Sequence, residues 1–443
     1  MATTIQDVLR RLRDDGIERI VLRLCDLQGD WQTIGLDVQQ LSEDAFHHGL
    51  SLQAGADDPW PAALPRSLTV SLDPGSAWID PFLTPRSLSL IGSFQAAPDT
   101  GRPLVHCPRT LASRAMAHLA ASGLADTALF SSESEYFVFQ ELTFHSDASG
   151  CACRAIAPHD APEGLQSELL LTLGALGIDT RSSDRLPAPP RLALTLGPAD
   201  LVRAADALMI GRYVARQGAA RHGLAATFLP RPTAAPAGAG LAVHQGLFKA
   251  GQPLFFGEGT YADLSQTARW YLGGLLHHGP SLAVFTNPGT NSYRRLASGG
   301  DGPSRLTYAR QDPSSVVTVP PTGRDPSQRR VVARQGDGLA NPYLAFSALL
   351  LAGLDGLRRQ LDPGPPADRV PPEGVAAEDC GLGVLPHDLA GSLAALAADQ
   401  AYLLAGGVFS PGLLQEWIRV KGREIEALEQ RPHPHEFALY PNA

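Results

Sequence analysis

The sequence predicts an α+β protein with a small β-rich domain at residues 1–102 and a larger α+β domain at residues 103–443. Three observations support this fold class. The chain is long enough for two or three domains. Its first hundred residues contain mostly alternating apolar and polar runs. Beyond about Pro103 the composition changes, and long helical patterns surround a single long strand.

The N-terminal segment predicts one helix and a small sheet. Two threonines precede an amphipathic pattern that ends at Gly16, which is typical of a capped helix. Alternating runs at 19–25 and 31–36 surround a short polar turn and predict a β-hairpin. A further alternating run at 87–94 predicts another strand. This segment therefore forms the small β-rich domain.

The larger domain is predicted to begin with a helix and a long strand and to end with helices. In order, the predicted elements are a helix at 108–122, a strand at 127–142, helices at 164–176 and 198–222, short strands and loops over 223–330, a helix at 341–361, and final helices at 387–404 and 411–430.

Composition excludes several classes of function. The formal net charge of −9 argues against nucleic acid as a partner, because binding phosphates needs a basic surface. No apolar run approaches 18 residues, so no membrane span is expected. The N-terminus lacks the pattern of a signal peptide, and the five cysteines cannot all pair. We expect a cytoplasmic protein that acts on a small molecule.

Two glutamates in the predicted strand at 127–142 form the first candidate site. Glu133 and Glu135 are two residues apart, so both side chains point to the same face of the strand. Two close carboxylates are unfavourable unless a cation or a proton is shared between them. The pair indicates a divalent-metal site or an acid/base pair, and the alternative is two glutamates on a solvated sheet face.

Three further segments contain candidate binding residues. The glycine-rich run that starts at Gly238 can approach a ligand closely and contains His244, although it could also be only a loop. The run at 287–296 contains Asn291 and Arg295, which could hold a carboxylate or could belong to an ordinary turn. Asn341, followed by proline, is a natural N-cap.

Taken in order, these segments resemble the glutamine synthetase family over nearly the whole chain. The motifs are DLQG at 26–29, IDPF at 79–82, ESEYF at 133–137, TFLPRP at 227–232, GAGLAVHQ at 238–245, NPGTNSYRRL at 287–296, NPYL at 341–344 and AGLDG at 352–356. The resemblance implies a β-grasp-like N-terminal domain, a catalytic C-terminal domain, and homo-oligomeric rings of six subunits, often stacked to twelve, with active sites between neighbours. It also implies ATP and Mg²⁺ or Mn²⁺ as cofactors, for phosphorylation of a carboxylate that ammonia or an amine then attacks.

The resemblance also implies roles for single residues. Glu133 and Glu135 match metal ligands, Arg295 matches the arginine that holds the substrate carboxylate, and Arg334 matches the arginine near phosphate and metal. Asp301 lies where the family has a catalytic flap glutamate. Gly238, His244 and Asn291 match further residues of the substrate site.

The sequence departs from the family pattern at most of the remaining ligand positions. Of six metal-binding side chains, only the two glutamates remain. The other positions map near Arg185, to Leu192 or Ala193, to Ala242 and to Val332, and two phosphate-binding arginines map to Pro313 and Thr318.

Three hypotheses follow from these replacements. The first is a diverged enzyme that acts on a small amino-acid-like or carboxylate-bearing substrate without the ATP and two-metal chemistry, with Glu133, Glu135 or Asp301 as the acid–base groups and Arg295 as the anchor. The second is an ATP-dependent carbon–nitrogen ligase of the γ-glutamyl amide type with an unusual substrate. The third is a non-catalytic pseudoenzyme with a binding or regulatory role.

Overall fold

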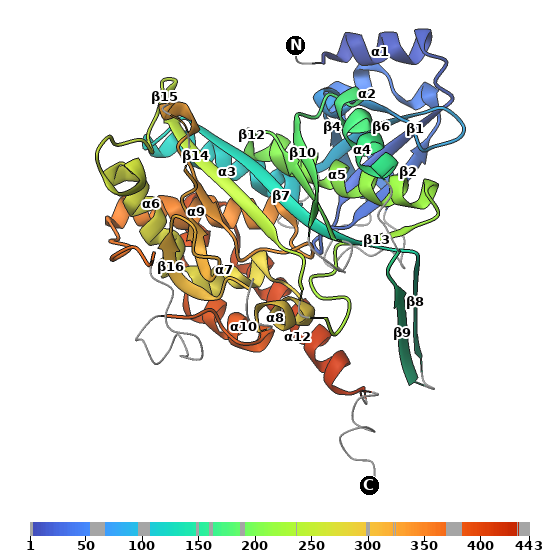
Figure 1. Cartoon of the computed structure of the whole chain (residues 1–443). Helices are drawn as coiled ribbons and strands as arrows, with labels where there is room; N and C mark the ends of the chain where they lie inside the picture. The colour runs from blue at the N-terminus through green and yellow to red at the C-terminus, as the bar shows by residue number, and fades with distance from the viewer. Residues whose placement is uncertain are drawn as a thin grey trace, which may run out of the picture.

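The described residues form two mixed sheets with helices packed on them and a separate two-stranded sheet, so the α+β class is confirmed (Figure 1). The structure, a computed structural model, describes the whole chain except residues 1–2, 54–66, 96–106, 148–149, 159–162, 187–190, 236, 298–301, 322, 324, 369–382, 432 and 434–443. The predicted domain boundary between residues 102 and 103 lies outside the described residues.

The first sheet is built from the N-terminal segment. Its elements are α1 (Ile5–Asp14), β1 (Arg19–Cys25), β2 (Trp31–Leu36), α2 (Glu43–His48), β3 (Leu50–Gln53), β4 (Ser67–Leu72), β5 (Trp78–Asp80) and β6 (Ser87–Gln95). The strand order is β2-β1-β6-β4-β3, and β5 pairs with β6. Strands β1 and β2 form the predicted antiparallel hairpin, while β1 and β6 run parallel.

The second sheet has ten strands in the order β10-β11-β7-β14-β18-β17-β16, with β12 and β13 on β7 and β15 on β14. The elements of this part are α3 (Pro108–Ser122), β7 (Thr127–Phe139), β8 (Glu141–Asp147), β9 (Gly150–Ile156), α4 (Glu163–Ala175), β10 (Thr180–Leu186), β11 (Arg191–Leu196), β12 (Ala199–Asp200), α5 (Leu201–Arg221), β13 (Ala225–Thr227), β14 (Leu241–Lys249), β15 (Gln252–Pro253), α6 (Gln266–His277), α7 (Gly279–Thr286), α8 (Thr290–Leu296), β16 (Arg305–Ala309), β17 (Ser315–Thr318), β18 (Val331–Ala333), α9 (Pro342–Arg359), α10 (Leu389–Ala398), α11 (Ala401–Leu404) and α12 (Pro411–Glu429).

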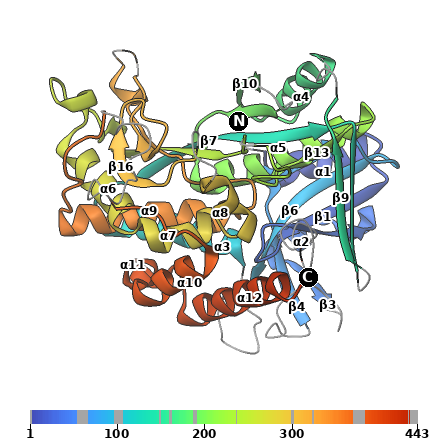
Figure 2. The same cartoon turned by 60° about the horizontal axis from the view of Figure 1, so that its bottom comes forward.

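The long strand β7 has one face in the core and one face toward the candidate site. Its alternate residues Phe130 and Tyr136 are buried and stack on Phe346 of α9 and on Phe228, with ring centroids 5.4 and 5.0 Å apart. Figure 2 shows α3 and α9 beside this strand, with α10 and α12 farther from it. Because side chains alternate along a strand, the intervening residues of β7 face away from this core.

Helix α9 joins the two sheets at its first turn. Asn341 is the N-cap, and its Oδ1 accepts hydrogen bonds from the backbone N–H groups of Tyr343 (3.1 Å) and Leu344 (3.5 Å). Its Nδ2 donates to the carbonyl oxygens of Asp26 (3.0 Å) and Leu27 (3.3 Å), in the turn of the N-terminal hairpin. The predicted cap is therefore confirmed, and the same side chain also connects the hairpin turn to the helical layer.

Three predictions about the larger domain are wrong. Residues 223–330 contain α6, α7 and α8 besides strands and loops, and the run at 287–296 ends in α8 rather than forming a turn. The predicted helix at 387–404 is divided into α10 and α11. These helices are short and mostly buried, so they lack the amphipathic periodicity that marks a longer surface helix.

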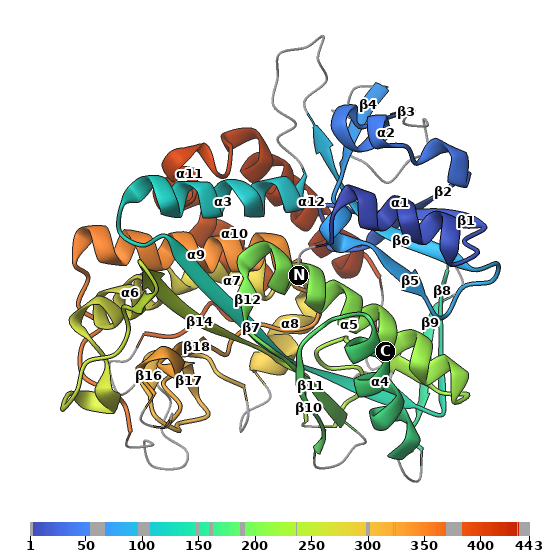
Figure 3. The same cartoon turned by 90° about the horizontal axis from the view of Figure 1, so that it is seen from above.

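The predicted strand at 127–142 is also divided, because β7 ends at Phe139 and β8 begins at Glu141. Strands β8 and β9 form a separate two-stranded sheet that projects beyond the body of the molecule in Figure 1; seen from above, they lie on the right, near β5 of the first sheet (Figure 3). Phe144 on this arm is 81% exposed. Among the described residues, no single helix has the length and apolar character of a membrane span; α10 together with residues 401–407 meets that test only as a bent pair.

Candidate active site

The candidate site lies on the face of β7 that points away from the helical core. Glu133 is paired with Ala242 of β14 on one side and with Thr195 of β11 on the other. Glu135 is paired with Ala193 of β11. Directly paired residues share a face of the sheet. The two glutamates therefore point the same way, as predicted.

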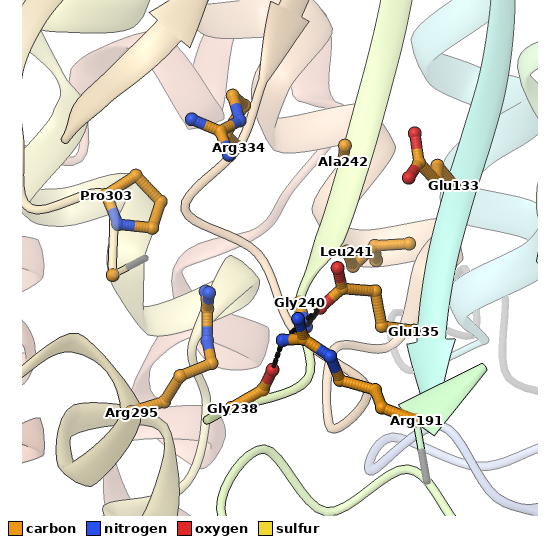
Figure 4. A pocket seen from close by; sticks show the side chains of 11 residues that line it. Glu133, Glu135, Arg191, Gly238, Gly240, Leu241, Ala242, Arg295, Pro303 and Arg334 are labelled. Carbon is orange, nitrogen blue, oxygen red and sulfur yellow. Dashed lines mark hydrogen bonds and ion pairs between the residues drawn. The ribbon is translucent and has the colours of Figure 1, made fainter. Parts of the chain in front are cut away.

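A cavity of about 290 Å³ opens beside the two glutamates (Figure 4). Its lining comes from β7, β11, β14, α8 and the segments around them: Glu133, Glu135, Arg191, Gly238, Gly240, Leu241, Ala242, Arg295, Gly302, Pro303 and Arg334. Figure 4 shows glutamates on one side and Arg295 and Arg334 on the other. The cavity is small and highly polar, which suits a small charged molecule.

The carboxylate of Glu135 already has two partners from the chain. Its Oε2 accepts a hydrogen bond of 2.7 Å from the backbone N–H of Gly240 and lies 3.5 Å from Nη1 of Arg191. Arg191 also donates from Nη1 to the carbonyl oxygen of Gly238. A carboxylate paired in this way is held in one orientation.

The carboxylate of Glu133 is in a different environment. Burial raises its pKa, and the nearby carboxylates of Glu135 and Asp184 raise it further, whereas Arg334 lowers it. A carboxyl group with a raised pKa can hold a proton closer to neutral pH, which is what a general acid or base requires. Of the two glutamates, Glu133 is therefore the better candidate for proton transfer.

Two arginines face the glutamates across the cavity. Arg295, on α8, is 5% exposed and donates to the carbonyl oxygens of Gln335 and Gly336, the latter at 2.8 Å. Arg334 directly follows β18 and donates to the carbonyl oxygen of Pro313 at 2.9 Å. Both guanidinium groups line the cavity and are suited to a carboxylate ligand.

A buried aspartate helps to balance the charge of Arg295. Asp337 is fully buried and accepts hydrogen bonds from Nδ2 of Asn287 (3.0 Å) and from the backbone N–H of Leu339 (3.0 Å). Burial raises the pKa of Asp337, and the positive charge of Arg295 opposes that rise. Burial also lowers the pKa of Arg295, an effect that the charge of Asp337 opposes. Each of the two charges therefore favours the ionised form of the other within the core.

Glycine is required in the run that starts at Gly238, because the backbone of this run comes very close to the side chain of Arg295. A Cβ atom at Gly238 would lie 2.5 Å from Cγ of Arg295. A Cβ atom at Gly240 would lie 3.2 Å from Nη1 of Arg295 and 3.6 Å from Oε2 of Glu135. Glycine at these positions lets the loop approach both charged groups.

The structure brings together five of the predicted site residues. Glu133, Glu135, Gly238, Arg295 and Arg334 all line the one cavity, although they come from distant parts of the sequence.

The other three predicted residues do not line this cavity or are not described. Asn291 instead supports the neighbouring loop, because its side chain accepts from the backbone N–H of Arg231 (2.7 Å) and donates to that residue's carbonyl oxygen (2.9 Å). His244 lies two residues beyond Ala242 on the same face of β14; burial lowers its pKa to about 4, and neither ring nitrogen has a hydrogen-bond partner among the described residues. Asp301 lies outside the described residues.

Arg191 is the residue that sequence reasoning missed. It begins β11 and is 7% exposed, and it shares the site face with Ala193 because Leu192 and Leu194 point into the core. The leucines that alternate along this strand could have revealed which side chains face the glutamates. Of the two alternative mapped positions, Ala193 faces the site and Leu192 is buried in the core.

Comparison with known proteins agrees with this fold. Residues 105–440 match the family model described as the catalytic domain of glutamine synthetase. The chain is 35% identical to a glutamine synthetase of Nostoc sp., over 99% of both chains, and 34% identical to one of Mycobacterium tuberculosis, over 99% of this chain and 98% of the other. It also superposes on the Plasmodium falciparum glutamine synthetase with a TM-score of 0.88 at 19% identity, covering 99% of this chain and 98% of that one. This chain belongs to the glutamine synthetase family.

Proposed function

We propose that this protein is a diverged member of the family that binds a small amino-acid-like or carboxylate-bearing molecule and acts on it without the ATP and two-metal chemistry. The observation that carries the proposal is that the carboxylate of Glu135 already has partners from the chain itself. A carboxylate expected to hold a divalent cation is instead engaged by Arg191 and by the N–H of Gly240.

The residues around the glutamates do not fit the metal ions that the family implies. Mg²⁺ and Mn²⁺ prefer oxygen ligands arranged around one point. Ala193 and Ala242 are paired with the two glutamates, and Val332 is paired with His244 of β14. The side chains of Ala193, Ala242 and Val332 contain no oxygen that could bind a metal ion. Within the described part of the chain, no three His, Cys, Asp or Glu side chains are grouped closely enough to hold a metal ion.

The groups that remain suit a carboxylate ligand and proton transfer. Arg295 and Arg334 can bind the ligand carboxylate, because a guanidinium group offers two parallel N–H donors. Glu133, with its raised pKa, can take or give a proton at the bound molecule. Asp301 remains a third proposed acid–base residue.

The second candidate is an ATP-dependent carbon–nitrogen ligase with an unusual acid or amine. It is favoured by the full-length similarity to proteins named glutamine synthetase at 34–35% identity. For this second function, residues other than those that line the cavity would have to complete the set of metal ligands. For either function we propose the homo-oligomeric rings that the family resemblance implies.

The two candidates are distinguished by ADP release. The protein is incubated with ATP, Mg²⁺ and a panel of small acids and amines, and binding of each acid is measured separately without nucleotide. We expect binding of carboxylates without ATP, weakened in Arg334→Gln, and no acid-dependent ADP release. Release of ADP that requires both an acid and an amine would support the ligase. Failure of every carboxylate to bind would leave the non-catalytic alternative.

A further inference from the structure

Two oxygen acceptors meet at one edge of the cavity, and the chain supplies its own cation to both. These acceptors are the carboxylate of Glu135 and the backbone carbonyl of Gly238. A carboxylate beside a carbonyl in a small polar cavity is an arrangement that attracts an ammonium group or a metal ion. Here the guanidinium of Arg191 contacts both groups, as the dashed lines in Figure 4 show for Gly238.

The position of Arg191 follows from the sheet. Its backbone is paired with Phe137 of β7, and the alternating leucines of β11 pack into the core on the opposite face. Arg191 is 7% exposed, so its charge is held inside the protein. A shift of this strand by one residue would place the leucines at the site and the arginine in the core, which fixes the register.

We propose that Arg191 is a built-in counter-cation, and that the cavity therefore selects carboxylates that carry no ammonium group beside the carboxylate. This inference rests on the proposed function and narrows it from amino-acid-like molecules to plain carboxylic acids. The guanidinium takes the acceptors that a ligand ammonium would need.

The charges that face the rest of the cavity support the same choice. Arg295 and Arg334 line it together with Arg191, and three guanidinium groups repel a ligand ammonium but attract a ligand carboxylate. A ligand amine placed beside Glu135 would therefore lose its hydrated environment without gaining the two acceptors that Arg191 already contacts.

The test compares pairs of probes that differ only in the amine. Binding of glutarate and L-glutamate, and of succinate and L-aspartate, is measured by calorimetry on the full-length protein and on Arg191→Gln. For the protein we expect glutarate or succinate to bind at least tenfold more tightly than its amino-acid partner. In Arg191→Gln, which frees both acceptors, we expect that preference to fall at least tenfold. Arg181→Gln is the control, because this arginine lies on the neighbouring strand β10 and its side chain is 61% exposed. The Arg181→Gln variant should keep the preference of the unchanged protein for the plain acids.

The outcomes separate this inference from the proposed function. Equal or tighter binding of the amino acids by the unchanged protein overturns the inference and leaves the proposed carboxylate pocket intact. Failure of all four probes to bind overturns both. If Arg191→Gln does not fold, Arg191→Lys retains the positive charge and should keep the preference for the plain acids; a Lys variant that prefers the amino acids contradicts the inference.

Discussion

Asn341 should contribute more to stability than an ordinary helix cap, because its side chain serves two parts of the molecule. It is 1% exposed, caps α9, and donates to two carbonyl oxygens of the N-terminal hairpin turn. Loss of an N-cap costs about 1 kcal/mol. Loss of a buried donor to two carbonyl oxygens of the turn adds roughly 1–2 kcal/mol. We expect Asn341→Ala to lower the free energy of unfolding by about 2–3 kcal/mol.

The assay is urea unfolding at one fixed protein concentration, because any subunit association couples stability to concentration. Ser410→Ala is the matched control. Ser410 caps α12 by accepting from the N–H of Leu413 at 3.1 Å, so its loss should cost only about 1 kcal/mol. If Asn341→Ala is no more destabilising than Ser410→Ala, the hydrogen bonds from Asn341 to the hairpin turn contribute nothing to the free energy of unfolding. That result would contradict the expected loss of about 2–3 kcal/mol.

Three further predictions concern the cavity. Burial and two neighbouring carboxylates raise the pKa of Glu133, so the folded state holds this proton more tightly than the unfolded state. Stability should fall as pH rises above the ordinary glutamate pKa of about 4.3 and through the raised pKa, and Glu133→Gln should reduce this fall in the urea midpoint. Arg295→Met should destabilise the protein because it removes one of the buried positive charges near Asp337, and a double-mutant cycle with Asp337→Asn should give a coupling free energy of roughly 0.5–3 kcal/mol between the two residues. Gly238→Ala, whose Cβ would lie 2.5 Å from Cγ of Arg295, should weaken glutarate binding in calorimetry at least tenfold; an unchanged affinity would show that the loop can move away.

Local sequence patterns predicted the long elements but not the short buried ones. Helices α3 and α9 have caps and apolar periodicity, and the hairpin of β1 and β2 has alternation around a turn, so each was found close to its observed ends. Helix α8 has only seven residues, and α7 is buried along nearly its whole length. Their positions depend on tertiary packing, which local propensity does not contain.

The site was predictable where residues shared a strand or a motif. The spacing of Glu133 and Glu135 predicted their common face, and the resemblance to the family predicted that Arg295 would lie near them. Arg191 was missed because its role depends on the register between β7 and β11, which are separated by more than fifty residues in the sequence. Asn291 lies outside the lining of the cavity and binds the backbone of Arg231; in the sequence, an amide that binds a ligand looks the same as one that binds another loop.

We propose that this member of the glutamine synthetase family has lost the metal-dependent nucleotide site beside Glu133 and Glu135. The direct test is calorimetric titration of the purified protein with ATP in excess Mg²⁺, repeated with Mn²⁺. We expect no metal-dependent binding at millimolar nucleotide. Tight binding that requires the metal ion would contradict the account and would make the ATP-dependent ligase the better description of this protein.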